Sequence, residues 1–157
     1  MKLSADEIRE LDALLEPLYA DEQVQSMNDF VQHGAVSTYA HCRNVTDASF
    51  WINRHLGFHA DERTLATAAL LHDFYLYDWH GSGWRHSYRH PLCASRNAQA
   101  RFGINERTAS AIESHMWPIG ITRPPRTREA LVLCIADKYC ALLETLLLRK
   151  EAKSLCR

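Results

Sequence analysis

Residues 65–74 read LATAALLHDF, and this stretch decides how the rest of the chain is interpreted. Leu65, Ala68 and His72 are spaced at helical intervals, so they share one face of a helix that Asp61 can cap. His72 therefore points where the apolar residues point, towards the core. Imidazole and carboxylate are both good ligands for divalent metals, so His72 and Asp73 form a candidate metal-binding pair. Alone the pair is weak, because a hydrogen-bonded core histidine would also explain it.

Four further residues of the same chemical types lie on other predicted elements, each among small or apolar neighbours. They are His41, His90, His115 and Asp137. The neighbours of Asp137 on its helix face are small, Ala130, Cys134 and Ala141, which leaves room for a metal cluster. An unpaired buried carboxylate costs several kcal/mol. We therefore expect a cation beside Asp137.

The spacing of apolar residues and the caps predict an all-α, single-domain bundle of about six to seven helices over residues 1–157. No segment alternates long enough to require a strand. The capping box Ser4/Glu7 starts the first helix at about residue 5, and Asn105 and Thr127 start the last two. The other predicted segments are a short helix over 22–31, a helix through 39–56, a loop over 76–90, a helix from Pro91 to Phe102 closed by Gly103, and a loop over 118–126.

The composition is typical of a folded protein, and its charges do not indicate a nucleic-acid partner. Hydrophobic residues make up 46% of the 157 residues, and the formal net charge is -1 with scattered Lys and Arg. We therefore expect no nucleic-acid polymer as ligand. There is no signal-like leader and no stretch of about 20 apolar residues, so we expect a cytoplasmic protein that does not enter membranes. The five cysteines include no Cys-x-x-Cys pair and are expected to be reduced.

The ordered set of motifs resembles the HD-domain superfamily of metal-dependent phosphohydrolases. The resemblance spans about residues 33–145 and is carried by QHGAVSTYAHCRNV, LLHDF, HPLCASRNA, ESHMWP and CIADKYCALLE. It implies a helical bundle with a two-metal site. His41, His72, Asp73 and Asp137 would hold one metal, and Asp73, His90 and His115 the second. Asp73 would bridge the two.

Two divalent ions and two carboxylates leave such a site positively charged, so it should attract an anion. Metals about 3.5 to 4 Å apart can hold a bridging hydroxide as nucleophile and polarise a phosphoryl oxygen. We therefore predict hydrolysis of a small phosphorylated substrate, with nucleotides as one class. Imidazole-rich ligation favours Fe, Mn, Zn or Ni over Mg.

One position departs from the family pattern. Members of the superfamily often carry a lysine three residues after the Asp of the His-Asp pair, where it contacts substrate phosphate, and this chain has Leu76 there. The candidates to replace it are Arg43, Lys138, Arg123 and Arg126, for each of which a solvated surface cation is the alternative interpretation. We assign catalytic roles to Asp73, Asp137 and Lys138.

The remaining histidines and the loop leave alternatives open. Residues Tyr77, Asp78, His80 and Trp84 form either a lid or proton relay, or an ordinary surface loop. The histidines interpreted as structural or solvent-exposed are His33, His55, His59 and His86. Two other functions stay open: a di-iron oxygenase similar to inositol oxygenase and the phosphonate-cleaving oxygenases, and a non-catalytic metal-binding module.

Overall fold

The computed structural model describes the chain over residues 1–33, 36–78 and 85–155, and side chains over 1–32, 36–78 and 88–146. In the described chain we find seven α-helices, one 3-10 helix and one hairpin, so the predicted all-α class is confirmed. The elements are α1 (Ala5–Tyr19), α2 (Glu22–Gln25), η1 (Ser26–Asp29), β1 (Val31–His33), β2 (Val36–Ser37), α3 (Thr38–His55), α4 (Glu62–Leu71), α5 (Arg85–Phe102), α6 (Glu106–Ser114) and α7 (Arg128–Leu155). Within the described residues no helix is both long and apolar enough to cross a bilayer.

Helix starts follow the local capping chemistry of the sequence. Ser4 and Glu7 form the predicted capping box of α1. Asp61 accepts a hydrogen bond from the Thr64 backbone N–H at the start of α4, and Asn105 does the same at α6. The Thr127 hydroxyl accepts from the Ala130 backbone at the start of α7. These four predicted helix starts are confirmed.

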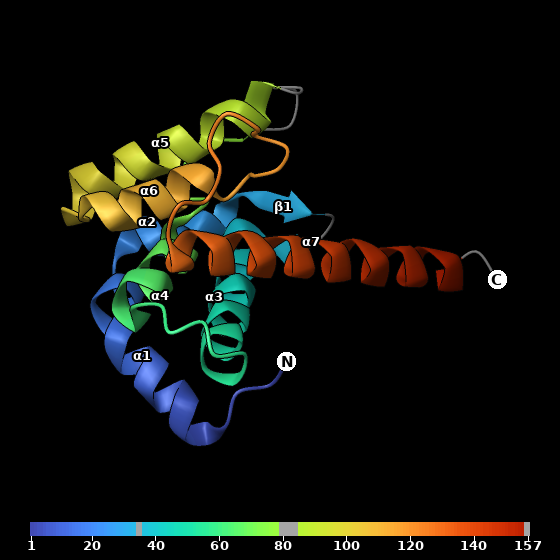
Figure 1. Ribbon diagram of the computed structural model, residues 1–157. Helices are drawn as coiled ribbons and strands as arrows, with labels where there is room; N and C mark the ends of the chain where they lie inside the picture. The colour runs from blue at the N-terminus through green and yellow to red at the C-terminus, as the bar shows by residue number, and fades with distance from the viewer. Residues whose placement is uncertain (34–35, 79–84, 156–157) are drawn as a thin grey trace.

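α4 is the centre of the fold, because its small residues let neighbouring helices approach closely. Seven of its ten residues are buried, and it packs against α1, α3, α6 and α7. Figure 1 shows α5 and α6 side by side at one end, α1 at the other, and α7 crossing the body and extending beyond it. α4 contacts α3, α5, α6 and α7, and α6 contacts α4, α5 and α7, so the residues that follow α4 and α6 lie where these helices meet.

The predicted secondary structure of two segments was wrong. α5 begins at Arg85, six residues before Pro91, so the second half of the predicted loop 76–90 is helical. Proline removes one helical hydrogen bond, and we attribute its tolerance here to the packing of α5 along α6. The predicted helix 22–31 is divided into α2, η1 and the start of β1. Asn28 donates its side-chain N–H to the Gln25 carbonyl, a local bond that competes with a continuing helix.

The hairpin is the one strand pair in the described chain and was not predicted. β1 and β2 are antiparallel, with Val31 opposite Ser37 and His33 opposite Val36. Three and two residues are too few to show a period of two in the sequence. The hairpin matters because it carries Gln32 into the site.

Candidate metal centre

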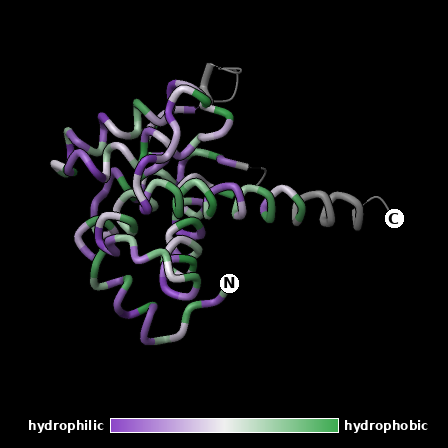
Figure 2. Tube along the Cα trace, in the orientation of Figure 1, coloured by the Kyte–Doolittle hydropathy of each residue, from purple (hydrophilic) through white to green (hydrophobic). Residues whose placement is uncertain are grey.

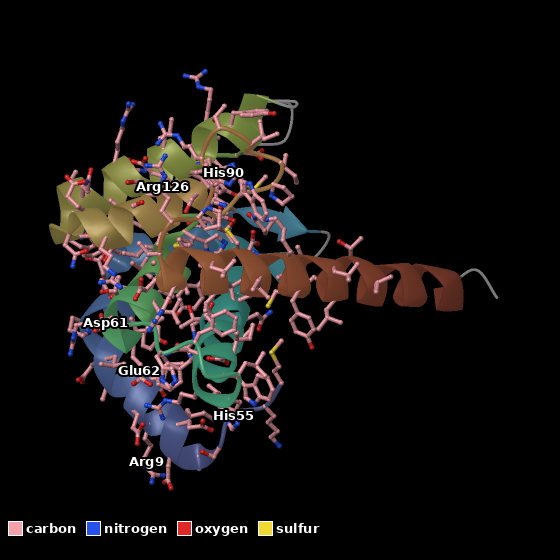
Figure 3. The ribbon with its side chains drawn as sticks, in the orientation of Figure 1. Arg9, His55, Asp61, Glu62, His90 and Arg126 are labelled. Carbon is pink, nitrogen blue, oxygen red and sulfur yellow. The ribbon has the colours of Figure 1, made fainter. Side chains whose placement is uncertain are left out.

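The six residues predicted as metal ligands come together from five helices, although they span almost 100 residues of sequence. All six are buried, with side chains that the solvent barely reaches. They are His41 on α3, His72 and Asp73 directly after α4, His90 on α5, His115 directly after α6, and Asp137 on α7. Figure 3 places His90 near α6 and β1, far from Arg9 and His55 at the opposite end of the molecule.

One half of the cluster, which we call the α3/α7 half, lies between those two helices. His41 Nε2 is 3.2 Å from Asp137 Oδ1, and His72 Nε2 is 3.9 Å from the same oxygen. Asp73 contributes its Oδ2 atom, which is 3.4 Å from His72 Nε2.

The other half, which we call the α5/α6 half, uses the second oxygen of the same carboxylate. Asp73 Oδ1 is 3.2 Å from His90 Nε2 and 3.7 Å from His115 Nε2, and these two nitrogens are 2.9 Å apart. Each half therefore receives one oxygen of Asp73. This is the arrangement expected of a carboxylate that bridges two cations.

Two of the histidines are aimed by the same local device. His72 and His115 each follow the last residue of a helix, and the Nδ1 atom of each bonds a carbonyl three residues earlier. The His72 bond to Ala69 is 2.8 Å long and the His115 bond to Ile112 is 2.7 Å long. With Nδ1 held by the helix end, Nε2 faces the cluster, which is how a histidine is prepared to bind a metal.

The donor set fits divalent cations. His72 Nε2 and Asp73 Oδ1 are buried without a hydrogen-bond partner among the described residues, and such orphaned polar atoms are costly unless a ligand satisfies them. A metal binding nitrogen or oxygen at about 2.0–2.2 Å holds its donors roughly 3 Å apart, close to the separations found in both halves. Three overlapping groups of these six residues have the spacing needed to hold an ion.

Burial disfavours charge on both carboxyl groups of the cluster, yet both are ionised. The pKa of Asp73 lies well below its usual range, because the surrounding histidines, His72 and His90 above all, outweigh burial. The pKa of Asp137 is also lowered, since the hydrogen bond from His41 and the charge of Lys138 oppose the effect of burial. The centre therefore holds two anionic oxygen ligands at neutral pH.

The pKa values of three histidines in the cluster are shifted in opposite directions. Burial favours the neutral form of His41, but hydrogen bonds to Asp137 and Glu144 outweigh it and raise its pKa to about 10. Burial lowers the pKa of His72. Burial, with His72 and His90 nearby, lowers the pKa of His115 to about 3. His72 and His115 are therefore neutral and available as ligands.

Glu144 belongs to this site and was not predicted. Its Oε2 atom is 2.9 Å from His41 Nδ1, and Asn44 donates to its Oε1 atom at 3.0 Å. A carboxylate on the distal nitrogen fixes the orientation of a metal-binding imidazole and raises its basicity. Glu144 lies seven residues after Asp137, two helical turns away on the same face, so this spacing was a usable sequence signal.

Gln32 on β1 was also missed, and it orients Asp73. Its Nε2 atom donates to Asp73 Oδ2 at 2.5 Å. Its Oε1 atom accepts hydrogen bonds from the hydroxyls of Tyr75, at 2.6 Å, and Thr38, at 3.3 Å. Because two hydroxyls occupy the amide oxygen, the amide nitrogen must face the carboxylate. No local pattern links residues 41 positions apart, so the sequence held no signal for this contact.

The four cationic side chains proposed to contact the substrate phosphate lie in different parts of the structure. Lys138 lies at the cluster, where Nζ donates to Asp137 Oδ2 at 2.7 Å and to the His115 carbonyl at 2.8 Å. Arg43 does not reach it, since its guanidinium stacks on Tyr19 and lies 3.6 Å from Asp12 of α1. Arg123 and Arg126 line a separate pocket of about 390 Å³, where Arg123 pairs with Glu113.

Some of the loop residues and histidines named in the sequence analysis lie outside the residues that the structure describes. Tyr77 stacks obliquely on Tyr75, with ring centroids 4.9 Å apart, and is half-buried. His80 and Trp84 lie outside the described residues, as do the side chains of His33 and His86. Leu76 packs partly buried against the core with a positive φ of 55°, a backbone conformation that is strained for leucine.

Comparison with known proteins gives one match. No curated protein and no solved structure matches the chain significantly. A family model described as HD domain matches residues 38–142, a range that contains all six cluster residues. Proteins of this family are usually metal-dependent hydrolases with an all-α fold. The chain belongs to the HD-domain family.

Proposed function

We propose that the protein is a phosphohydrolase that uses two divalent metal ions to cleave a small phosphorylated substrate. The observation that carries the proposal is the division of six buried donors into two halves around the two oxygens of Asp73. A single-metal site would not need two histidines on the second oxygen of one carboxylate. His41, His72, Asp73 and Asp137 would hold the first ion, and Asp73, His90 and His115 the second.

When bound, a pair of such ions lowers the pKa of a water molecule and polarises a phosphoryl oxygen. The chain supplies the rest of the machinery. Gln32 and Glu144 hold Asp73 and His41 in place from opposite sides. Asp137 accepts hydrogen bonds from His41 and Lys138 and so stays ionised.

Lys138 is the cation we assign to the substrate phosphate in place of the family lysine that is Leu76 here. An ammonium group has three donors, and two of those on Lys138 are used by Asp137 and the His115 carbonyl. Among the described residues no acceptor takes the third, which could therefore donate to an anion held between Asp137 and His115. The side chain is about one-third exposed, so a ligand can reach it from solvent.

The test begins with protein purified without added metal, whose metal content is measured by elemental analysis. Phosphomonoesters, phosphodiesters and nucleotides are then screened with the metal found, with and without chelator. We expect turnover that requires a transition metal and disappears in His115→Ala. His55→Ala is the matched control, because His55 is an exposed histidine that stacks on Trp51 outside the cluster.

Two outcomes would contradict the proposal. Full hydrolysis in protein shown to be free of metal would exclude the role assigned to the cluster. Oxygen consumption by the iron-loaded protein, without hydrolysis of any phosphate ester, would assign the same six donors to a di-iron oxygenase instead.

A further inference from the structure

The outer face of α7 is apolar, although it is exposed. Between residues 128 and 146 the exposed positions are Arg128, Leu131, Ile135, Tyr139, Leu142, Leu143, Thr145 and Leu146. Six of these eight are large hydrophobic residues, and the single charge, Arg128, stands at one end. Figure 2 shows hydrophobic residues recurring along this helix as it leaves the body. A surface helix of a monomer would carry charged and polar residues on this face.

The exposed apolar residues form one continuous stripe. Leu131, Ile135, Tyr139, Leu142 and Leu146 follow one another at intervals of four, four, three and four residues. At about 100° per residue they fall within an arc of about 80°, and Leu143 lies beside them. We call these six residues the α7 stripe. Because Asp137 and Glu144 point inwards to the metal centre, the two faces of α7 serve different purposes.

The size of the stripe indicates a protein interface. Its side chains are 37–59% exposed and together present on the order of 400 Å² of apolar surface, the size at which a patch on a monomer marks an interaction site. Two copies of the stripe would contribute on the order of 800 Å².

We propose that the α7 stripe binds the α7 stripe of a second copy of this chain, with the two helices antiparallel. The order of the residues supports a two-fold axis. Leu131 with Leu146, and Ile135 with Leu142, share one midpoint between residues 138 and 139, so both pairs meet in the same antiparallel register. Tyr139 lies beside the axis. Such self-complementarity is what a two-fold interface requires.

The same pairing accounts for the part of α7 that leaves the body. In the antiparallel register, residues 139–149 of one copy lie along residues 128–138 of the other, so α7 is supported as far as residue 149. An isolated helix of about 12–15 residues is marginal in water, so support from a partner stabilises it. The charged residues between Leu131 and Leu146 are Asp137, Lys138 and Glu144. The two carboxylates are buried, and Lys138, on the flank of the stripe, directs its Nζ atom to Asp137 and the His115 carbonyl.

A membrane surface fits the stripe less well than a second copy. Helices that lie in the interface of a bilayer carry lysine and arginine along their polar flank. Among the exposed residues of α7 from 128 to 146, Arg128 is the single cation. Over residues 128–146 the stripe therefore lacks the flanking charges that attract anionic lipid, and Arg149, Lys150 and Lys153 come only after its last residue.

The test uses the full chain and measures its mass by sedimentation over a range of concentrations. We expect a dimer of twice the 18.0 kDa chain mass at low micromolar concentration. Leu142→Glu should weaken the dimer at least 100-fold. Leu56→Glu is the matched control, because Leu56 is 60% exposed and Leu142 is 59% exposed. Circular dichroism confirms that each variant is folded.

A mixing experiment tests the register. Ile135→Lys and Leu142→Glu should each be monomeric alone. An equal mixture should form a dimer, because the new positive charge of one copy would face the new negative charge of the other. A wild-type monomer at 100 µM would overturn the proposal, as would a monomer that co-sediments with phosphatidylglycerol vesicles. Failure of the mixture to dimerise would overturn the antiparallel pairing. None of these readouts depends on metal or on hydrolysis.

Discussion

The two halves of the metal centre hold their histidines in different ways. In the α3/α7 half, His41 has a carboxylate on each ring nitrogen, Asp137 on Nε2 and Glu144 on Nδ1. In the α5/α6 half, the Nδ1 of His115 bonds the backbone carbonyl of Ile112 and, among the described residues, no carboxylate. The two carboxylates outweigh burial and raise the pKa of His41 to about 10, whereas burial, with His72 and His90 nearby, lowers the pKa of His115 to about 3. A cation entering the first half must displace a proton, whereas one entering the second half finds a neutral imidazole.

The change expected to have the largest effect removes the residue that both halves share. Asp73→Ala should lose both metal ions, because each half depends on one oxygen of this carboxylate. Turnover should fall at least about 1,000-fold, since several kcal/mol of metal-derived stabilisation are lost. Elemental analysis beside turnover measures both effects. Retention of two metal ions by the folded variant would show that Asp73 does not bridge them.

Removing a ligand from one half should affect the metal ion of that half and leave the other ion bound. His115→Ala and His90→Ala should each retain the ion of the α3/α7 half and lose or weaken the other. Turnover should fall roughly 100-fold or more, because the reaction needs both ions. Titration with Mn²⁺, followed by metal per chain after gel filtration, provides the count. If both variants keep two ions and full turnover, these histidines are structural.

A smaller effect is expected from the residue that orients His41. Glu144→Gln keeps the shape of the side chain but removes its charge, and should weaken metal binding in the α3/α7 half by about 10–100-fold. Glu16→Gln is the control, because Glu16 is an exposed residue of α1. Equal metal affinity in the two variants, measured by calorimetry, would assign Glu144 a purely structural role.

The pH dependence of metal binding should also differ between the halves. Below pH 10 the metal-free chain carries a proton on His41 that metal binding releases, so affinity in the α3/α7 half should rise about tenfold per pH unit between pH 7 and 9. In the α5/α6 half, His115 is already neutral well below pH 7. Calorimetry in buffers of different ionisation enthalpy counts the released protons. Identical proton release in wild type and His41→Ala would contradict this assignment.

The raised pKa of His41 predicts how the stability of the metal-free protein depends on pH. His41 has a folded pKa above its usual 6.5, so its bonds to Asp137 and Glu144 contribute fully below pH 6.5 and are lost as pH rises through 10. We therefore expect the Tm of chelated protein to fall between pH 7 and 10. Glu144→Gln should reduce this slope. A Tm that is independent of pH over this range would refute the effect.

Helix starts and the six residues of the cluster were predictable because their signals are local. Ser4, Asp61 and Asn105 each act on a backbone N–H within three residues, and the structure confirms all three caps. The ligands could be found because histidine and aspartate are unusual among small apolar neighbours. The start of α5 was missed because Pro91 was given its most common role at a helix start, whereas tertiary packing allows it inside the helix.

Contacts between distant segments could not be predicted in the same way. Gln32 reaches Asp73 only because the hairpin folds back over the end of α4. Arg43 was a reasonable candidate by its position near His41, but two residues along a helix turn the side chain away, towards Tyr19. The identity of the metal and of the substrate stays a prediction.

The most direct test of the central claim is the metal content of the wild-type protein and its Asp73→Asn variant, each purified without added metal and compared with turnover. Two transition-metal ions per wild-type chain, with loss of both ions and of turnover in the isosteric variant, is the result we expect. A single ion per wild-type chain that Asp73→Asn retains would contradict a centre built around the two oxygens of Asp73.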